Sequence, residues 1–294
     1  MNDGHLTGKN LVFLVGCPRS GTTWLQRLLA AHPQIKTGQE SHLFEYIGPQ
    51  LRLWKSHLNR PAGERSGLGL PCYFSEEEFY AAIKEYLSRL MRPMLNGLEP
   101  GEIFLEKTPG HAIFIREIAE LLPCARIIHL VRDPRDVVAS LLAVSRSWGQ
   151  NWAPRQARQA AHLWARHVKA AQGGAAILPL GQFLEVRYES LYCDPLSTLR
   201  NIAHFLNLSW ADEEIQVAVK ANSTNELQQG RGTPIPVAGE HGKQNAPVLQ
   251  EPKGFVRKAR RGSWKEDLTW MERFEVWYVL RKAMPAWRRY ADKS

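Results

Sequence analysis

The feature that most constrains the fold of this 294-residue chain is a stretch near its N-terminus, LVFLVGCPRSGTTW (residues 11–24). Five apolar residues lead into a glycine, a turn, a second glycine and an apolar, helix-like segment. This order predicts a buried strand, a phosphate-cradling loop and a helix, as in the motif G-x-x-x-x-G-K-[ST]. Thr22 stands where that motif has lysine, and the nearest cation is Arg19, inside the loop. The loop therefore favours a phosphate-like anion but lacks the lysine that grips a γ-phosphate.

Strand-like and helix-like segments alternate along the rest of the chain. Strands are expected at residues 10–15, 102–107, 125–131 and 182–188, and helices at residues 21–31, 75–91, 132–144, 154–172, 195–206 and 269–283. The alternation predicts an α/β fold, with a central, mostly parallel sheet flanked by helices on both faces. Ligands of such sheets bind beyond the carboxyl ends of the strands. Polar clusters follow three of these ends, at 16–23, 106–111 and 132–140, and predict one site at one rim.

We expect a single domain, residues 1–294, without internal repeats. Two stretches, 43–72 and 222–262, are rich in glycine, proline and basic residues and show little periodicity, so they are expected to be long substrate or donor loops. Loop tryptophans are expected to shape an acceptor pocket: Trp54, Trp148 and Trp152.

Composition narrows the class of protein. The longest apolar runs are too short to span a bilayer, and the N-terminus has no signal-peptide core. The four cysteines are far apart, which argues against a zinc site or a disulfide scaffold and favours a reducing, cytoplasmic location. The net charge of +9 favours an anionic ligand, but no nucleic-acid-binding module is present, so no nucleic-acid partner is expected.

The strand at 125–131 runs into Arg132, whereas an NTPase usually has an aspartate there to hold Mg²⁺. A cation at this strand end suits a second anion, and Ser140 can add a hydroxyl from the following helix. Asp133 is interpreted as a helix-start residue, and no metal site is expected. A P-loop kinase or NTPase and a non-catalytic anion-binding protein remain alternatives, disfavoured by Thr22 and Arg132.

Four segments, in order, resemble the sulfotransferases that use 3′-phosphoadenylyl sulfate (PAPS), and the first is closest to the carbohydrate and tyrosine-protein branches: GCPRSGTTW, RIIHLVRDPRDVVASLL, RYESLYCDPLSTLRNIAHFLNL and RKARRGSWKEDL. The resemblance covers nearly the whole chain. It implies a P-loop NTPase-like sulfotransferase fold and metal-free transfer of a sulfuryl group, with 3′-phosphoadenosine 5′-phosphate (PAP) as product. The acceptor would be a hydroxyl or amine of a small-molecule, sugar or lipid-like compound. The oligomeric state stays open.

The resemblance also implies roles for donor-binding residues. At the 5′-phosphosulfate these are Arg19, Ser20, Gly21, Thr22 and Thr23. At the adenine they are Trp24 and Tyr188, although Trp24 could simply pack in the core. At the 3′-phosphate they are Arg132, Ser140, Arg257, Lys258 and the backbone of Ala259. Two departures are Ala259, where the family usually has glycine, and Asn225, where it often has phenylalanine against the second face of the adenine.

Two segments can supply the catalytic base, GQESHLF (38–44) and EKTPGH (106–111). By resemblance, Glu40 is the base, His42 a second acidic-site residue, and Lys107 the lysine of the family's K-T-P turn. His111 is the alternative base, but Pro109 occupies the spacing at which the small-phenol branch has its histidine. Residues 33–40 span at most roughly 26–29 Å when extended, which is enough for the chain to return to the rim after the first helix.

Overall fold

The computed structural model of the chain describes residues 7–59, 69–236, 256 and 260–292. These residues form a five-stranded sheet in the order β2-β3-β1-β4-β5, in which every neighbouring pair is parallel. The strands are β1 (Leu11–Gly16), β2 (Ile35–Thr37), β3 (Ile103–Lys107), β4 (Arg126–Val131) and β5 (Phe183–Arg187). The predicted α/β class is confirmed, and β2 lies within residues 33–40, which were expected to return to the rim as a strand or an extended segment.

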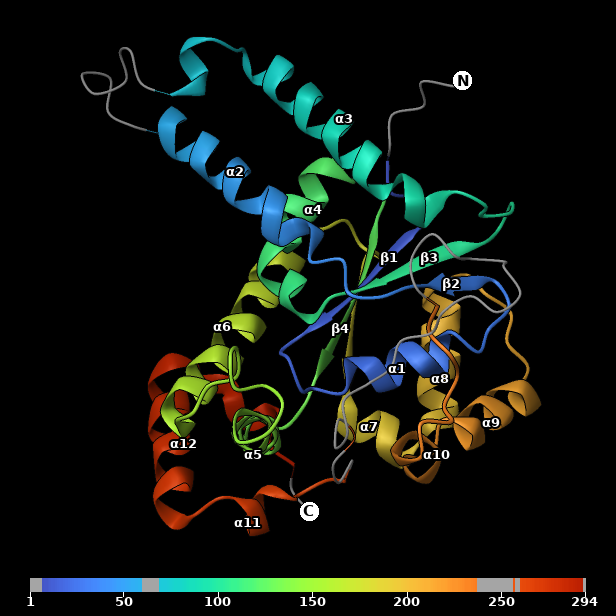
Figure 1. Cartoon of the computed structure of the whole chain (residues 1–294), viewed down its shortest axis with the longest axis vertical. Coiled ribbons are helices and arrows are strands. Elements are labelled where there is room, and N and C mark those ends of the chain that lie inside the picture. Colours follow the sequence, from blue (N-terminus) through green and yellow to red (C-terminus); the bar gives the residue numbers. More distant parts are fainter. Residues whose placement is uncertain (1–6, 60–68, 237–255, 257–259, 293–294) are drawn as a thin grey trace.

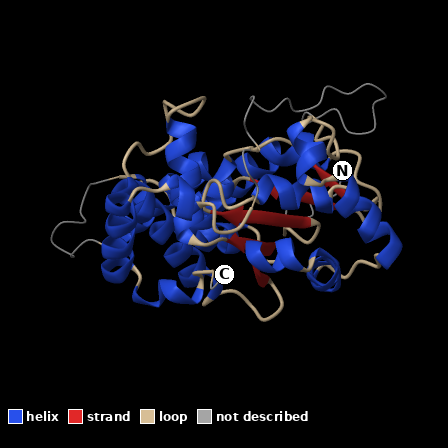
Figure 2. Cartoon of the chain, turned by 90° about the horizontal axis from the view of Figure 1, so that it is seen from below, coloured by secondary structure: helices blue, strands red, loops and turns tan. Residues whose placement is uncertain are grey.

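Helices cover both faces of this sheet (Figure 1), and a view from below shows the strands as a central layer between them (Figure 2). The α-helices are α1 (Thr22–Leu29), α2 (Leu43–Leu58), α3 (Glu76–Leu95), α4 (Ile115–Leu121), α5 (Pro134–Ser145), α6 (Ala157–Ala175), α7 (Tyr188–Cys193), α8 (Pro195–Phe205), α9 (Asp212–Ala221), α10 (Thr224–Gln228), α11 (Trp264–Asp267) and α12 (Trp270–Ala283). Short 3₁₀ helices are η2 (Leu70–Cys72), η3 (Pro109–Phe114) and η4 (Pro285–Arg289). Within the described residues, no helix is both long and apolar enough to cross a lipid bilayer.

Strand β1 is apolar throughout because both of its faces are covered. Leu11, Phe13 and Val15 pack on the side of α2, α3 and α4, in one cluster of buried residues. Val12 and Leu14 point the other way and join α1, α8 and α9 in a second cluster. Side chains alternate across a strand, so a strand between two helix layers needs apolar residues at every position.

A third cluster of buried residues joins α5, α6 and α12. The largest fully buried side chain in it is that of Trp164 of α6. Its indole Nε1 donates a hydrogen bond of 3.0 Å to the main-chain oxygen of Arg132. Packing of these helices therefore also fixes the chain where it leaves β4.

The structure corrects one expectation about the stretch 43–72, because its first part is the 16-residue helix α2 rather than a loop. Phe114 packs against Gly48 of this helix, and a Cβ at that position would come within 2.3 Å of the ring. Trp54, expected near an acceptor, is 3% exposed and stacks on Phe79 with ring centroids 4.0 Å apart. Trp54 is therefore a core residue.

Candidate active site

The loop between β1 and α1 is held by two glycines. At Gly16 a Cβ would lie 2.5 Å from the main-chain oxygen of Leu130, on the neighbouring strand. Gly21 has a φ of 99°, and a Cβ there would lie 2.7 Å from the ring of Tyr188. Both the left-handed backbone and the close ring require glycine at this position. Arg19 also has a positive φ, 73°, which is uncommon for any residue other than glycine.

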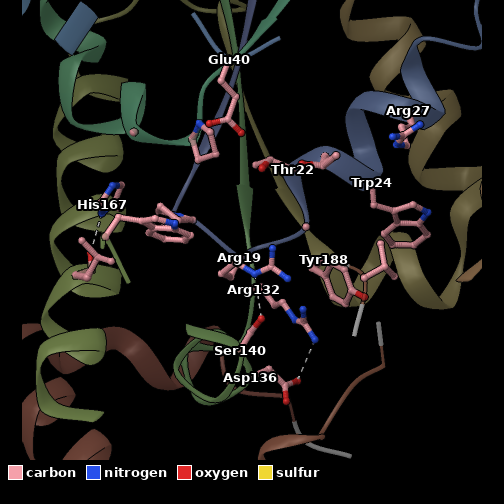
Figure 3. Close-up of a pocket in the computed structure, with 18 of the residues that line it drawn as sticks. Arg19, Thr22, Trp24, Arg27, Glu40, Arg132, Asp136, Ser140, His167 and Tyr188 are labelled. Atoms are coloured by element: carbon pink, nitrogen blue, oxygen red, sulfur yellow. Dashed lines mark hydrogen bonds and ion pairs between the residues drawn. The ribbon is translucent and has the colours of Figure 1, made fainter. Parts of the chain in front are cut away.

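This loop opens into a cavity of about 780 Å³. The chain segments that follow β1, β3 and β4 all contribute to it, so the predicted convergence of three strand ends is confirmed. Most of the predicted site residues line it: Arg19, Gly21, Thr22, Thr23, Trp24, Glu40, His42, Arg132, Ser140 and Tyr188. Figure 3 shows Trp24 and Tyr188 on one side of this cavity and His167 on the opposite side, with Glu40 beyond the loop.

Trp24 and Tyr188 form the aromatic side of the cavity. Their ring centroids are 5.5 Å apart at an interplanar angle of 62°. The indole Nε1 of Trp24 donates to the main-chain oxygen of Asn222 at 3.1 Å, which fixes the ring plane. Burial raises the pKa of the Tyr188 hydroxyl, so this ring stays neutral near pH 7. From α10, Leu227 and Thr224 line the same cavity.

Arg132 lies against the face of Tyr188, with its guanidinium carbon 4.1 Å from the ring centroid. Its Nη2 donates to the main-chain oxygen of Arg260 at 2.9 Å and lies 3.9 Å from Asp136 Oδ2. Its Nε is buried without a hydrogen-bond partner among the described residues. A buried guanidinium with an unpaired N–H is suited to bind an anion at the cavity wall.

Asp136 was not predicted, although it lies in the motif RDPRD. It is buried in the first turn of α5 and accepts hydrogen bonds from Gly262 N, Ser263 Oγ and Trp264 N at 2.9–3.1 Å. It thereby ties the turn at 262–264 to the helix that carries Ser140. Asp133 caps the same helix, as expected, by accepting from Arg135 N at 2.8 Å.

The loop and α5 also meet through Arg19. Its Nε donates to Ser140 Oγ at 3.2 Å, and its guanidinium carbon lies 5.5 Å from the Trp148 ring centroid. Trp148 and Trp152 both line the cavity, as expected of the loop tryptophans after α5. The Arg19 side chain therefore connects the phosphate loop with Ser140 of α5 and with the ring of Trp148.

Glu40 reaches the cavity next to Lys107, the last residue of β3. Lys107 Nζ donates to Glu40 Oε1 at 2.5 Å and to Thr23 Oγ1, at the start of α1, at 3.3 Å. The lysine side chain is only 3% exposed, whereas that of Glu40 is 36% exposed. One buried cation thus connects the loop with an accessible carboxylate.

His42 lies between two carboxylates. Its Nε2 is 3.5 Å from Glu40 Oε2, and its Nδ1 is 2.9 Å from Glu45 Oε1, in the first turn of α2. All three side chains line the cavity. Glu45 was missed from the sequence because its position depends on α2, which had been expected to be a loop.

His111, the alternative base, has a different environment. It is fully buried and does not line the cavity. Its Nδ1 lies 2.9 Å from Glu106 Oε2, and its Nε2 accepts from the main-chain N–H of Phe44 at 3.1 Å. Burial alone would raise the pKa of Glu106, but His111 and hydrogen bonds from Thr108 and Ser41 lower it to about 2. Both ring nitrogens of His111 are therefore occupied.

The remaining predicted residues are Ser20, whose buried hydroxyl has no hydrogen-bond partner in the described part of the chain, and Arg257, Lys258 and Ala259, which lie outside that part. Sequence reasoning also missed His167 of α6, because nothing in a helical repeat reveals which polar residue faces a cavity. Among the described residues, no three His, Cys, Asp or Glu side chains are grouped so that they could hold a metal ion.

Comparison with known proteins agrees with the family suggested by the four segments. The chain is 26% identical over 203 residues to protein-tyrosine sulfotransferase 1 of Danio rerio and 27% identical over 203 residues to protein-tyrosine sulfotransferase of Drosophila melanogaster. Each alignment covers 69% of this chain but only 54% and 39% of the two relatives, so the chain spans about half of their length or less.

Solved structures show the same fold. Mouse sulfotransferase SULT7A1, complexed with PAP, superposes with a TM-score of 0.62 at 16% identity over 99% of this chain and 95% of that one. The sulfotransferase domain from the curacin biosynthetic pathway gives 0.55 at 18% identity over 93% and 96%. The sequence profile of the sulfotransferase family matches residues 12–212. The chain therefore belongs to the sulfotransferase family.

Proposed function

We propose that this protein transfers the sulfuryl group of PAPS to an acceptor hydroxyl, with Glu40 as general base. The observation that carries the proposal is the Lys107–Glu40 pair, which joins a cation and an accessible carboxylate to the phosphate loop at Thr23. Family membership supports the reaction class, and the mouse sulfotransferase of the same fold is a complex with PAP. The small-molecule acceptor and the cytoplasmic location stay predictions.

The residues present fit a donor that carries two anionic groups. Arg132 Nε and Ser20 Oγ are buried without partners among the described residues, and both groups can donate to phosphate oxygens. Gly21 allows the loop backbone to pass close to Tyr188, because the Cβ of any larger residue would clash with the tyrosine ring. Trp24 and Tyr188 offer aromatic faces to a purine. When bound, PAPS would supply the sulfuryl group, and PAP would leave.

We assign separate roles in donor binding and proton transfer to the residues of the chain. Arg19 and the loop amides hold the 5′-phosphosulfate, and Lys107 sets a positive charge beside it. Arg132 and Ser140 hold the 3′-phosphate, together with Arg257 and Lys258. Glu40 takes the proton of the acceptor hydroxyl, a contribution of about 10²–10⁴-fold. His111 is unsuited to this role because both of its nitrogens are engaged away from the cavity.

Donor recognition can be measured by calorimetry with PAP and AMP, which differ in the 3′-phosphate. We expect PAP to bind at least about 10-fold more tightly, because a charge-assisted hydrogen bond contributes about 1.5–3 kcal/mol. Arg132→Gln should remove most of this difference, whereas Arg89→Gln on the exposed face of α3 should retain it. Equal affinity of the wild type for PAP and AMP would contradict the proposal.

Turnover is tested with radiolabelled PAPS and a panel of hydroxyl-bearing acceptors. A thermal-shift comparison of PAP with ATP plus Mg²⁺ separates this function from that of a P-loop kinase. Stabilisation by ATP plus Mg²⁺ but not by PAP would favour the kinase. Tight PAP binding without transfer to any acceptor would favour an anion-binding protein.

A further inference from the structure

The last described residues of the chain, 289–292, pack against β5, an edge strand of the sheet, and are called the C-terminal segment here. The main-chain oxygens of Arg289 and Tyr290 accept hydrogen bonds of 2.7 and 2.9 Å from the guanidinium of Arg187, the last residue of β5. Tyr290 is buried, and its hydroxyl lies 3.2 and 3.1 Å from Oε1 and Oε2 of Glu185. These contacts fix the C-terminal segment at the carboxyl end of β5.

The backbone of Asp292 contacts the start of α5, which follows β4. Its N–H donates to Asp133 Oδ2 at 2.7 Å, and its main-chain oxygen accepts from Arg135 Nη2 at 2.9 Å. Asp133 is fully buried and directly follows Arg132 in the chain. The C-terminal segment therefore supports the turn from which the Arg132 side chain reaches the cavity.

The carboxylate of Asp292 contacts a second segment that supports Arg132. Its Oδ2 lies 3.1 Å from Arg261 Nε, and the Asp292 and Arg261 side chains are 13% and 28% exposed. The residue before Arg261 is Arg260, whose main-chain oxygen accepts the hydrogen bond of 2.9 Å from Arg132 Nη2. Arg132 is thus supported through Asp133 and through Arg260, and Asp292 contacts Asp133 and the residue next to Arg260.

The negative charge of Asp292 makes its location informative. Arg132 is suited to bind an anion, and a carboxylate in its vicinity would by itself repel that anion. Neither Asp292 nor Arg261 is among the described residues that line the cavity, so solvent and salt screen this repulsion. The hydrogen bonds between a guanidinium and a phosphate, by contrast, depend strongly on orientation. Holding Arg132 in place is therefore the larger effect that Asp292 can have on anion binding.

We propose that Asp292 is a positioning residue for the donor: through Arg261 and Asp133 it holds Arg132 in the orientation that binds the 3′-phosphate. The inference rests on the proposed function, in which Arg132 contacts this phosphate, and assigns a role to a residue outside the cavity. It also separates two kinds of support. The backbone of Asp292 holds the turn after β4, whereas its carboxylate acts on the turn that contains Arg260.

The test is Asp292→Asn in the full chain, with PAP and AMP as probes in calorimetry. Asparagine keeps the main-chain hydrogen bonds of residue 292 and removes the charge that pairs with Arg261. We expect the Kd of PAP to rise by about 5–10-fold, because charge-assisted contacts to the 3′-phosphate weaken, and the Kd of AMP to stay unchanged. In turnover, KM for PAPS should rise while kcat stays within about twofold of the wild type. Repulsion alone predicts the opposite sign, tighter binding of PAP.

Two further variants and a control define the route of the effect. Arg261→Gln should weaken PAP binding to a similar extent, and the double variant should be no weaker than the weaker single variant, because both act through one contact. Asp292→Glu keeps a carboxylate and should restore most of the affinity for PAP. The matched control is Asp212→Asn, which removes an exposed aspartate–arginine pair with Arg200 and should leave both affinities unchanged.

Unchanged or tighter binding of PAP by Asp292→Asn would overturn the inference. An equal loss of affinity for PAP and AMP would also overturn it, because it would indicate a general defect of the fold. If Asp292→Asn does not fold, Arg261→Gln decides by the same comparison of PAP with AMP. Equal affinity of the wild type for PAP and AMP would instead refute the proposed function, and the inference would fail with it.

Discussion

Glu40 and Glu106 are two carboxylates near the end of β3, and their surroundings are opposite. Glu106 is 1% exposed and accepts from Ser41 Oγ at 2.7 Å, Thr108 Oγ1 at 2.6 Å and His111 Nδ1 at 2.9 Å. Glu40 is accessible, and its close hydrogen bond comes from Lys107. A carboxylate whose lone pairs are filled holds the fold, whereas one with accessible lone pairs can take a proton.

This difference arises from adjacent residues of one strand. Side chains alternate across a strand, so Glu106 and Lys107 point to opposite faces of β3. Glu106 joins the buried network with His111, and Lys107 points to the loop and Glu40. Sequence proximity in the motif EKTPGH therefore conceals two separate environments.

The largest expected effect is on catalysis at Glu40. Glu40→Gln should lower kcat by about 10²-fold or more, because the base is lost, while PAP affinity and the melting temperature stay near those of the wild type. Steady-state kinetics, calorimetry and thermal unfolding measure the three quantities. A near wild-type rate for Glu40→Gln, with a folded but inactive His111→Ala, would reverse the assignment.

The next effect is on stability at Glu106. Glu106→Gln replaces one acceptor oxygen by an amide that cannot accept, so a buried donor loses its partner. We expect the free energy of unfolding to fall by about 1–3 kcal/mol in urea titrations. The folded variant should lose less turnover than Glu40→Gln does. Unchanged stability together with a 10²-fold loss of kcat would mean that Glu106 acts in catalysis rather than in holding the fold.

A smaller effect concerns pH. The pKa of Glu106 is lowered from 4.5 to about 2 in the folded state, because His111, Thr108 and Ser41 stabilise its charged form. A depressed pKa contributes stability above the unfolded value, and this stability is lost as pH falls from about 4.5 towards 2. Urea unfolding at pH 5 and pH 3 should therefore show a larger drop for the wild type than for Glu106→Gln. Equal drops would mean that Glu106 is not the titrating group.

The smallest expected effect is that of metal removal, which is none. If Glu40 acts as a base, extensive treatment with EDTA should leave kcat unchanged within error. Loss of turnover in EDTA, restored by Mg²⁺, would instead indicate that Glu40 binds a metal ion. Glu40 and Glu106 would then differ in metal binding rather than in proton transfer.

The parts predicted from the sequence are those encoded by local patterns. The strand at 11–16, the loop glycines and the polar residues after three strands could be predicted because each signal lies within a few residues of its element. The start of α3 is encoded in an equally local way, by the capping box of Ser75 and Glu78. Parallel strand order then brings Arg132 beside the loop.

The parts that could not be predicted depend on distant partners. Gly48 and Pro49 have the character of helix breakers, yet α2 continues through both, and Phe114 occupies the space that a side chain at position 48 would need. The sequence leaves His111 open as a base, whereas in the fold the amide of Phe44 and the carboxylate of Glu106 occupy its two nitrogens. His167 becomes a site residue only when α6 packs beside η3.

The backbone at Arg19 has a consequence for protein engineering. Its φ of 73° lies in the left-handed region, where a residue other than glycine is held at a cost of about 1–2 kcal/mol. A search for stabilising substitutions that scored backbone fit alone would choose glycine here. The resulting protein would be more heat-resistant and would lack the cation that contacts Ser140. Thermal stability is therefore an unsuitable sole criterion for improving this chain, because its loop holds in an unfavourable conformation a side chain that we propose binds the 5′-phosphosulfate.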